Sequence, residues 1–142
     1  TMGQSTNAIL FYGFLIDEDD EYPFADIDDD DKDIEDLISE KYGLPYLDLP
    51  YNENKELYQE HWQAKDNLLK SIPVEIGTHC SCDYPMLFVC IKVSKTTAYR
   101  GYPKKVNDFE VGSDWNDQLN DFCDRTGIQP KEFGWYLVSL WC

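Results

Sequence analysis

Residues 6–16 read TNAILFYGFLI, and this run of aromatic and aliphatic side chains decides the fold of the chain. Its apolar residues occupy both parities, as in a central strand covered on two faces, whereas a strand with one wet face would alternate. The run therefore predicts a strand over residues 6–16 in the middle of a sheet, and the other elements are placed around it.

Three helices are predicted by apolar side chains that recur at helical spacing. In each case a polar residue can cap the start, and glycine or proline marks the end. The first helix is expected over 32–42 after Asp30 or Asp31 and before Gly43, the second after Asn52 or Asn54 and before Pro73, and the third between Ser113 and Gly127.

Two segments after the second helix are expected to be the strands of a hairpin. Residues 74–82 alternate as a half-buried strand does, with Cys80 and Cys82 on the inward side. Residues 86–93 read MLFVCIKV, a second continuous apolar run, and the turn at 83–85 joins the two strands antiparallel. A last strand is predicted over residues 135–141.

The resulting order is β-α-α-β-β-α-β. The chain has 142 residues, close to the usual size of one domain, and 42% of them are apolar, enough to build a core. We therefore predict a single α+β domain over 1–142, with a mainly antiparallel sheet of about four strands packed with three helices.

Negative charge is concentrated near the start of the chain. The net charge is −16, and the 20 residues from Asp17 to Asp36 hold 13 carboxylates and one lysine. Residues 17–31 carry no periodic pattern and are expected to form an acidic loop. The stretch 92–105 holds five cations and no acid, and is expected either to balance the acidic loop or to lie on a solvated face.

This charge argues against direct binding to nucleic acid or to anionic membranes and favours basic partners. No run reaches the roughly 18 to 20 apolar residues that a membrane span needs, so we expect a cytoplasmic protein that does not bind a membrane. The five cysteines have no regular spacing, and reduced thiols are expected.

Metal sites are not supported by the spacing of candidate ligands. The cluster HCSCD at 79–83 lacks the second ligand pair of a structural zinc site, and strand parity separates His79 from Cys80 and Cys82. Asp26, Asp28 and Asp30 have the first spacings of a calcium loop, but the glycine and glutamate positions do not match. We expect no dedicated metal and no cofactor, and weak calcium binding by the acidic loop is left open.

Three segments, STNAILFYGFL, THCSCDYPM and YRGYP, resemble a group of small uncharacterised proteins of phage or prophage type. The resemblance covers the first strand, the hairpin and the segment after it. It implies a phage or bacterial setting and no particular activity, and by analogy it favours proteins that block host defence.

The charge distribution favours an acidic protein-interaction domain. A row of carboxylates can imitate the phosphate backbone, so a phage-type inhibitor of this kind would compete for the basic surface of a host nucleic-acid-binding protein. The partner-binding residues would be Asp17, Glu18, Asp19, Asp20, Glu21, Asp26, Asp28, Asp29, Asp30, Asp31, Asp33, Glu35 and Asp36.

Two alternatives belong to other classes. One is a small metal-dependent hydrolase that uses His61 or His79 with carboxylates, although the chain contains none of the common catalytic motifs and an enzyme is the less favoured class. The other is a structural accessory domain without a catalytic role, in which the acidic run serves only solubility. A pocket that gathers a histidine with carboxylates would favour the enzyme, and a convex acidic ridge would favour the binder. Homo-oligomer formation is left open.

Overall fold

In the computed structural model, which describes residues 5–17, 33–106 and 108–142, strand β1 (Thr6–Ile16) is the centre of the sheet. Its bounds are those predicted from the apolar run. Both of its faces are covered, because side chains of both parities, such as Phe11 and Phe14, are fully buried.

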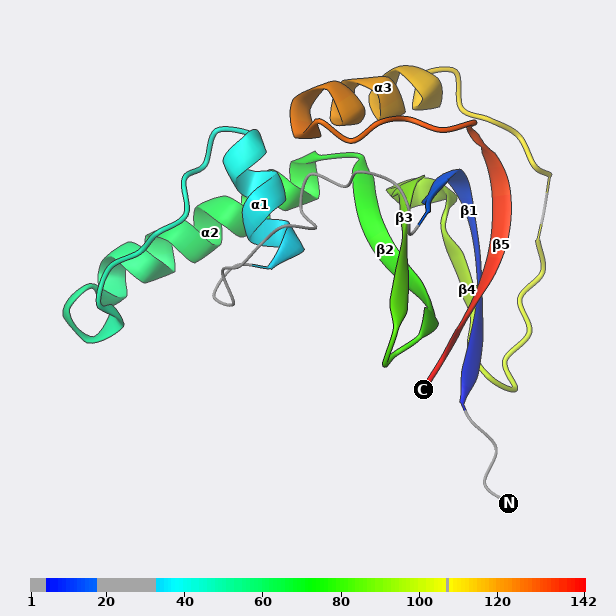
Figure 1. Ribbon diagram of the computed structural model, residues 1–142, viewed down its shortest axis with the longest axis horizontal. Coiled ribbons are helices and arrows are strands. Elements are labelled where there is room, and N and C mark those ends of the chain that lie inside the picture. Colours follow the sequence, from blue (N-terminus) through cyan, green and yellow to red (C-terminus); the bar gives the residue numbers. More distant parts are fainter. Residues whose placement is uncertain (1–4, 18–32, 107) are drawn as a thin grey trace.

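The other elements confirm an α+β single domain with three helices and a mostly antiparallel sheet (Figure 1). The sheet has five strands, one more than the approximate four that the sequence predicts. The elements are α1 (Ile34–Lys41), η1 (Tyr51–Glu53), α2 (Lys55–Ser71), β2 (Val74–Ser81), β3 (Pro85–Ile91), η2 (Lys92–Ser94), β4 (Thr96–Ala98), α3 (Trp115–Thr126) and β5 (Gly134–Trp141), where η marks a short 3₁₀ turn.

The sheet curls until it closes. Strand β1 pairs with β5 over residues 6–13, with β4 over 8–10 and with β3 over 13–16, all antiparallel. Strand β2 pairs with β3 along its length and meets β5 in a short parallel pairing at Cys80 and Ser81. Strands β1, β3, β2 and β5 therefore form a ring with an inner and an outer face.

Each face of the ring has its own apolar cluster. On the inner face, Phe11 and Phe88 stack with their ring centroids 4.1 Å apart, and Ile9 and Cys90 complete the cluster. Gly77 lies opposite Phe88, and a Cβ atom at Gly77 would overlap the Phe88 ring. The outer face is covered by the helices, whose buried residues form one cluster with Tyr12, Phe14, Ile16, Val74, Val89 and Ile91.

The predicted orientation of β2 is only partly right. Val74 and Ile76 do face the helices, but Gly77 and His79 face the inside of the ring rather than solvent. His79 lies 6.1 Å from the Phe88 ring, between centroids. The alternating pattern of β2 was expected to reflect one face in contact with solvent. In the structure, the second face of this strand lines the inside of the ring instead.

The prediction that Cys82 points inward is wrong, and so is the expectation of reduced thiols at this residue and at Cys142. Cys80 has a left-handed backbone, with φ 74°, which breaks the strand alternation. Cys82 is exposed beyond the end of β2, where it forms a disulfide with Cys142. The bond joins the ends of β2 and β5, where the ring closes. Cys80, Cys90 and Cys123 are free thiols.

Strand β4 was not predicted as an element of its own. Strand β3 ends at Ile91 rather than near 93, because the chain makes the turn η2 before β4 pairs again with the first half of β1. Ser94 makes this turn compatible with β1: its hydroxyl accepts a hydrogen bond from the backbone N–H of Tyr12 at 2.9 Å and donates to the Ile91 carbonyl at 2.6 Å.

The helix boundaries lie close to the predicted ones. Helix α1 begins at Ile34 rather than near 32, because Asp33 is its N-cap. The N-cap position of α3 is occupied by Asp114, one residue after the expected Ser113, without a side-chain capping hydrogen bond, and the helix ends as predicted at Gly127, which has φ 79°. Helix α2 begins after Asn54 and ends at Ser71, in agreement with the sequence.

The helices occupy two places. Helix α3 lies across one end of the ring, whereas α1 and α2 project from the side of the ring as an arm (Figure 1). The connection from α1 to α2 runs back along α2, so the far end of the arm contains η1 and the start of α2. Among the described residues, no helix has the length and apolar content to cross a membrane.

Candidate functional site

The predicted acidic surface lies only partly within the described residues. Asp17, Asp33, Glu35 and Asp36 are described, and the first of these follows β1 while the others lie at the start of α1. The remaining predicted partner-binding residues, Glu18, Asp19, Asp20, Glu21, Asp26, Asp28, Asp29, Asp30 and Asp31, fall outside the described residues, as does the calcium-like spacing.

Asp33 and Asp36 stabilise the start of α1. The Asp33 carboxylate accepts a hydrogen bond from the backbone N–H of Asp36 at 2.8 Å, and the Asp36 carboxylate accepts one from the backbone N–H of Asp33 at 3.2 Å. This reciprocal pair is a capping box, which satisfies N–H groups that the helix itself leaves unpaired. These two acids therefore have a structural role, whereas Glu35 is exposed beside them.

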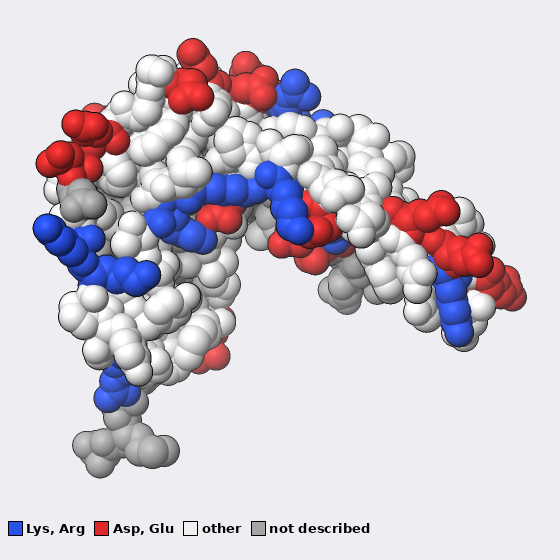
Figure 2. Space-filling model, turned by 180° about the vertical axis from the view of Figure 1, so that it is seen from behind, with Lys and Arg blue, Asp and Glu red and all other residues white. Residues whose placement is uncertain are grey.

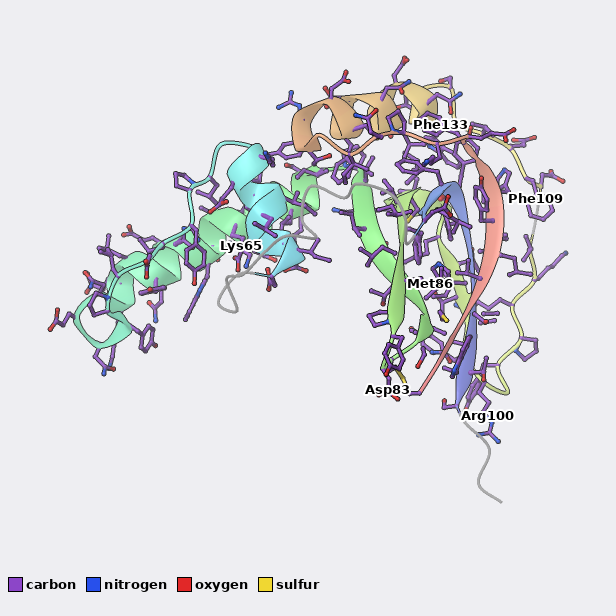
Figure 3. The ribbon with its side chains drawn as sticks, viewed as in Figure 1. Lys65, Asp83, Met86, Arg100, Phe109 and Phe133 are labelled. Atoms are coloured by element: carbon purple, nitrogen blue, oxygen red, sulfur yellow. A yellow bond between two sulfur atoms is a disulfide. The ribbon has the colours of Figure 1, made fainter. Side chains whose placement is uncertain are left out.

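Asp36 also joins α1 to α2 through an ion pair with Lys65 at 2.6 Å, and Figure 3 shows Lys65 on the arm. Burial alone would raise the pKa of Asp36, but the hydrogen bonds from Lys65 and Asp33 and the Lys65 charge outweigh it and lower the pKa below its usual 3.8. Burial would lower the pKa of Lys65, but Asp36 and its acidic neighbours raise it above 10.5. Both groups are therefore charged at neutral pH.

A groove of about 690 Å³ lies in the corner between the arm and the ring. Its apolar lining is made of aliphatic side chains from α1, α2 and β2. The arrangement suits a segment that carries both aliphatic and cationic side chains, since acids outnumber lysines around it. The charged lining residues are Asp33, Glu35, Asp66, Lys70, Glu75 and Lys92.

A second acidic surface, absent from the sequence predictions, lies on α3. Asp114, Asp117, Asp121 and Asp124 are spaced so that they share one face of the helix, and all of them are exposed. We call these residues the α3 face. Figure 2 shows acidic side chains along the edge of the molecule over α3. The opposite face of the helix is buried, so the acids form a convex ridge.

Helix stability explains only part of the α3 face: Asp114 is the N-cap residue and Asp117 lies in the first turn, where the helix dipole favours negative charge. Neighbouring carboxylates at helical spacing repel one another, and Asp121 and Asp124 lie toward the helix C-terminus, where the helix dipole disfavours negative charge. One local compensation is the pair of Asp121 with Arg125 at 3.1 Å, which is largely exposed and so contributes little. The spacing of these acids can be read in the sequence, although the run at 17–36 is denser in acids.

The basic stretch 92–105 is divided between internal contacts and the surface. Lys95 forms an ion pair with Glu75 at 2.5 Å, and Lys92 donates a hydrogen bond to the Leu69 carbonyl. Arg100, Lys104 and Lys105 are exposed. Figure 2 shows Lys and Arg side chains in a row across the back of the ring. The ion-pair partner of Lys95 is thus Glu75 of β2, and the ion-pair partner of Asp36 is Lys65 of α2.

The two histidines are not gathered with carboxylates in a pocket. Neither His61 nor His79 lines the groove. His79 lies at the inner face of the ring, where burial lowers its pKa, and its Nε2 atom has no hydrogen-bond partner. His61 belongs to α2. Neither histidine therefore lies with carboxylates in the groove.

The described cysteines do not belong to a cluster of possible metal ligands. Within residues 5–17, 33–106 and 108–142, no three His, Cys, Asp or Glu side chains come together as metal ligands. Burial raises the pKa of Cys90 to about 12 and that of Cys123 to about 11, so these thiols stay protonated at neutral pH. Cys90 and Cys123 are buried and act as small apolar side chains.

Comparison of the chain with protein-family models, with curated proteins and with solved structures finds no match.

Proposed function

We propose that this protein is an acidic protein-interaction domain that binds a basic surface on a partner. The observation that carries the proposal is the α3 face, a convex row of exposed carboxylates, two of which, Asp121 and Asp124, lie where they weaken their own helix. The acids of the groove and the acidic run from Asp17 to Asp36 add to the same charge. A net charge of −16 favours fast association with cationic surfaces.

The mechanism is competition with nucleic acid. A partner that binds the phosphate backbone offers rows of Lys and Arg, and exposed carboxylates can occupy them. In the phage setting that the sequence resemblance implies, such a partner would be a nucleic-acid-binding defence protein in the host cytoplasm. The accessory-domain alternative predicts no such partner.

The proposal is tested by affinity capture from a bacterial lysate at low and high salt, followed by elution with duplex DNA. A true partner should be retained at low salt, released by DNA, and bound far more weakly as salt rises, because exposed charges are screened within about 8 Å at physiological ionic strength.

Charge-neutralising variants then locate the surface. The change Asp117→Asn with Asp124→Asn should weaken binding about tenfold at low salt, since it removes charge that faces the partner. The control, Asp108→Asn with Asp83→Asn, has the same net charge but changes the connection between β4 and α3 and the far end of the ring, where Figure 3 shows Asp83. Equal binding by both variants, and by one that neutralises Asp28 to Asp31, would refute the proposal.

A further inference from the structure

The far end of the arm exposes apolar surface that nothing in the described chain covers. Helix α2 has 17 residues and none of them is buried. Leu68 and Leu69, near its C-terminal end, pack against the main core, but Leu57 and Trp62 are 48% and 51% exposed. The apolar stripe of α2 is therefore packed against the core where the arm joins the ring, and it is exposed at the far end of the arm.

Three aromatic rings at this end form an ordered cluster. Tyr51 stacks on Trp62 with centroids 6.0 Å apart, and Tyr58 lies within 6 Å of both. The Tyr58 hydroxyl donates to the Leu49 carbonyl at 2.5 Å and accepts from the Leu49 N–H at 3.3 Å, which holds the connecting segment against α2. The rings are thus positioned before any partner binds, which lowers the entropic cost of binding. We call Leu49, Tyr51, Leu57, Tyr58 and Trp62 the arm tip.

The charge around the arm tip selects the partner. Residues 48–62 contain four acids and a single lysine, Lys55. Figure 2 shows mainly acidic side chains over the far end of the arm. A second copy of the chain would bring like charges together, whereas a basic partner would bring opposite ones. Cations also bind the faces of Trp and Tyr rings.

We propose that the arm tip is a docking surface for a basic, amphipathic protein segment. Its Arg or Lys side chains would stack on Tyr51 and Trp62 and pair with nearby acids, while its apolar side chains would cover Leu57. Trp and Tyr are the residues that most often dominate binding energy at interfaces. The inference rests on the proposed function, from which it takes the positive charge of the partner. It adds an apolar contact at the arm tip, away from the α3 face.

The test uses the full chain and a synthetic amphipathic helical peptide with Arg on one face and Leu on the other, titrated calorimetrically at low salt. We expect the peptide to bind, and a version with Glu in place of Arg to fail. Trp62→Ala and Tyr51→Ala should each weaken binding at least about tenfold. Tyr84→Ala is the matched control, because Tyr84 is 82% exposed in the turn between β2 and β3, away from the arm (Figure 1), and it should leave the affinity unchanged.

The outcomes separate this inference from the proposed function. If the peptide fails to bind, or binds Trp62→Ala as well as the unaltered chain, the arm tip is not the docking surface. If that happens while Asp117→Asn with Asp124→Asn still loses the DNA-released partner, the proposed function stands without it. Dimers of the unaltered chain that Trp62→Ala converts to monomers, detected by sedimentation, would show that a second copy occupies the arm tip and would overturn the inference.

Discussion

The ring and the arm differ in how their apolar side chains are satisfied. In the ring, Phe11, Phe14 and Phe88 are buried completely or nearly so, and the strands close on one another. In the arm, the longest helix of the protein buries no residue, and its aromatic side chains stack on one another in contact with solvent. The ring therefore carries the stability of the fold, and the arm carries surface that is available for binding.

The largest effect is expected inside the ring. Phe88→Ala should lower the free energy of unfolding by about 3–5 kcal/mol, because it removes a buried ring that stacks on Phe11 and leaves a cavity. Urea denaturation followed by circular dichroism measures it. Leu137→Ala, on β5 but 74% exposed, is the control and should cost well under about 1 kcal/mol. Equal losses would mean that the inner face is not a packed core.

A smaller effect is expected where the ring closes. The disulfide between Cys82 and Cys142 spans 60 residues and reinforces the short pairing of β2 with β5. Cys82→Ser should therefore lower the free energy of unfolding by about 2–4 kcal/mol in the absence of reductant. Reductant should lower the melting temperature of the unaltered chain but not that of Cys82→Ser, and Cys80→Ser should respond as the unaltered chain does. An unchanged melting temperature on reduction would show that the bond does not support the ring.

The smallest effect is expected at the root of the arm. Asp36→Asn should cost about 1–2 kcal/mol, because it breaks the pair with Lys65 and weakens the capping box. The control is Asp66→Asn, which breaks an exposed pair with Lys70 on the same helix and should cost no more than about 0.5 kcal/mol.

The Asp36 effect should also depend on pH. The folded-state pKa of Asp36 is below 3.8, so its contribution is present above that value and is lost as the pH falls through the lowered pKa. The folded-state pKa of Lys65 is above 10.5, so its contribution is present below that value and is lost as the pH rises through the raised pKa. The difference between Asp36→Asn and the unaltered chain should therefore be constant near neutral pH and shrink at both extremes. If the difference in the free energy of unfolding does not vary with pH, the ion pair is not the cause of the Asp36→Asn effect.

Much of the fold could be predicted from local patterns. The double-parity run at 6–16 identified β1, helical spacing identified α2 and α3, and Gly127 marked the end of α3. Strand β4 was missed because its three residues are too few to show a pattern, and its pairing depends on the turn at Ser94.

The candidate sites were harder to predict. The acidic run was evident from composition, yet its described members include Asp33 and Asp36, whose carboxylates cap a helix. The α3 face was readable as a spacing of aspartates, but only burial of the opposite face shows that they form a ridge. The arm tip was not predictable, because Leu57 and Trp62 continue an apolar stripe that would ordinarily be buried along its whole length.

By itself, the sequence determined which segments are strands and helices, where the helices end, and that the chain is strongly acidic, because these depend on neighbouring residues and on composition. Only the tertiary structure decided that the sheet closes into a ring, that Cys82 meets Cys142, and that the end of α2 stays uncovered. These features depend on contacts between segments far apart in the chain, and an alternating pattern is the same whether its second face meets solvent or the inside of a ring.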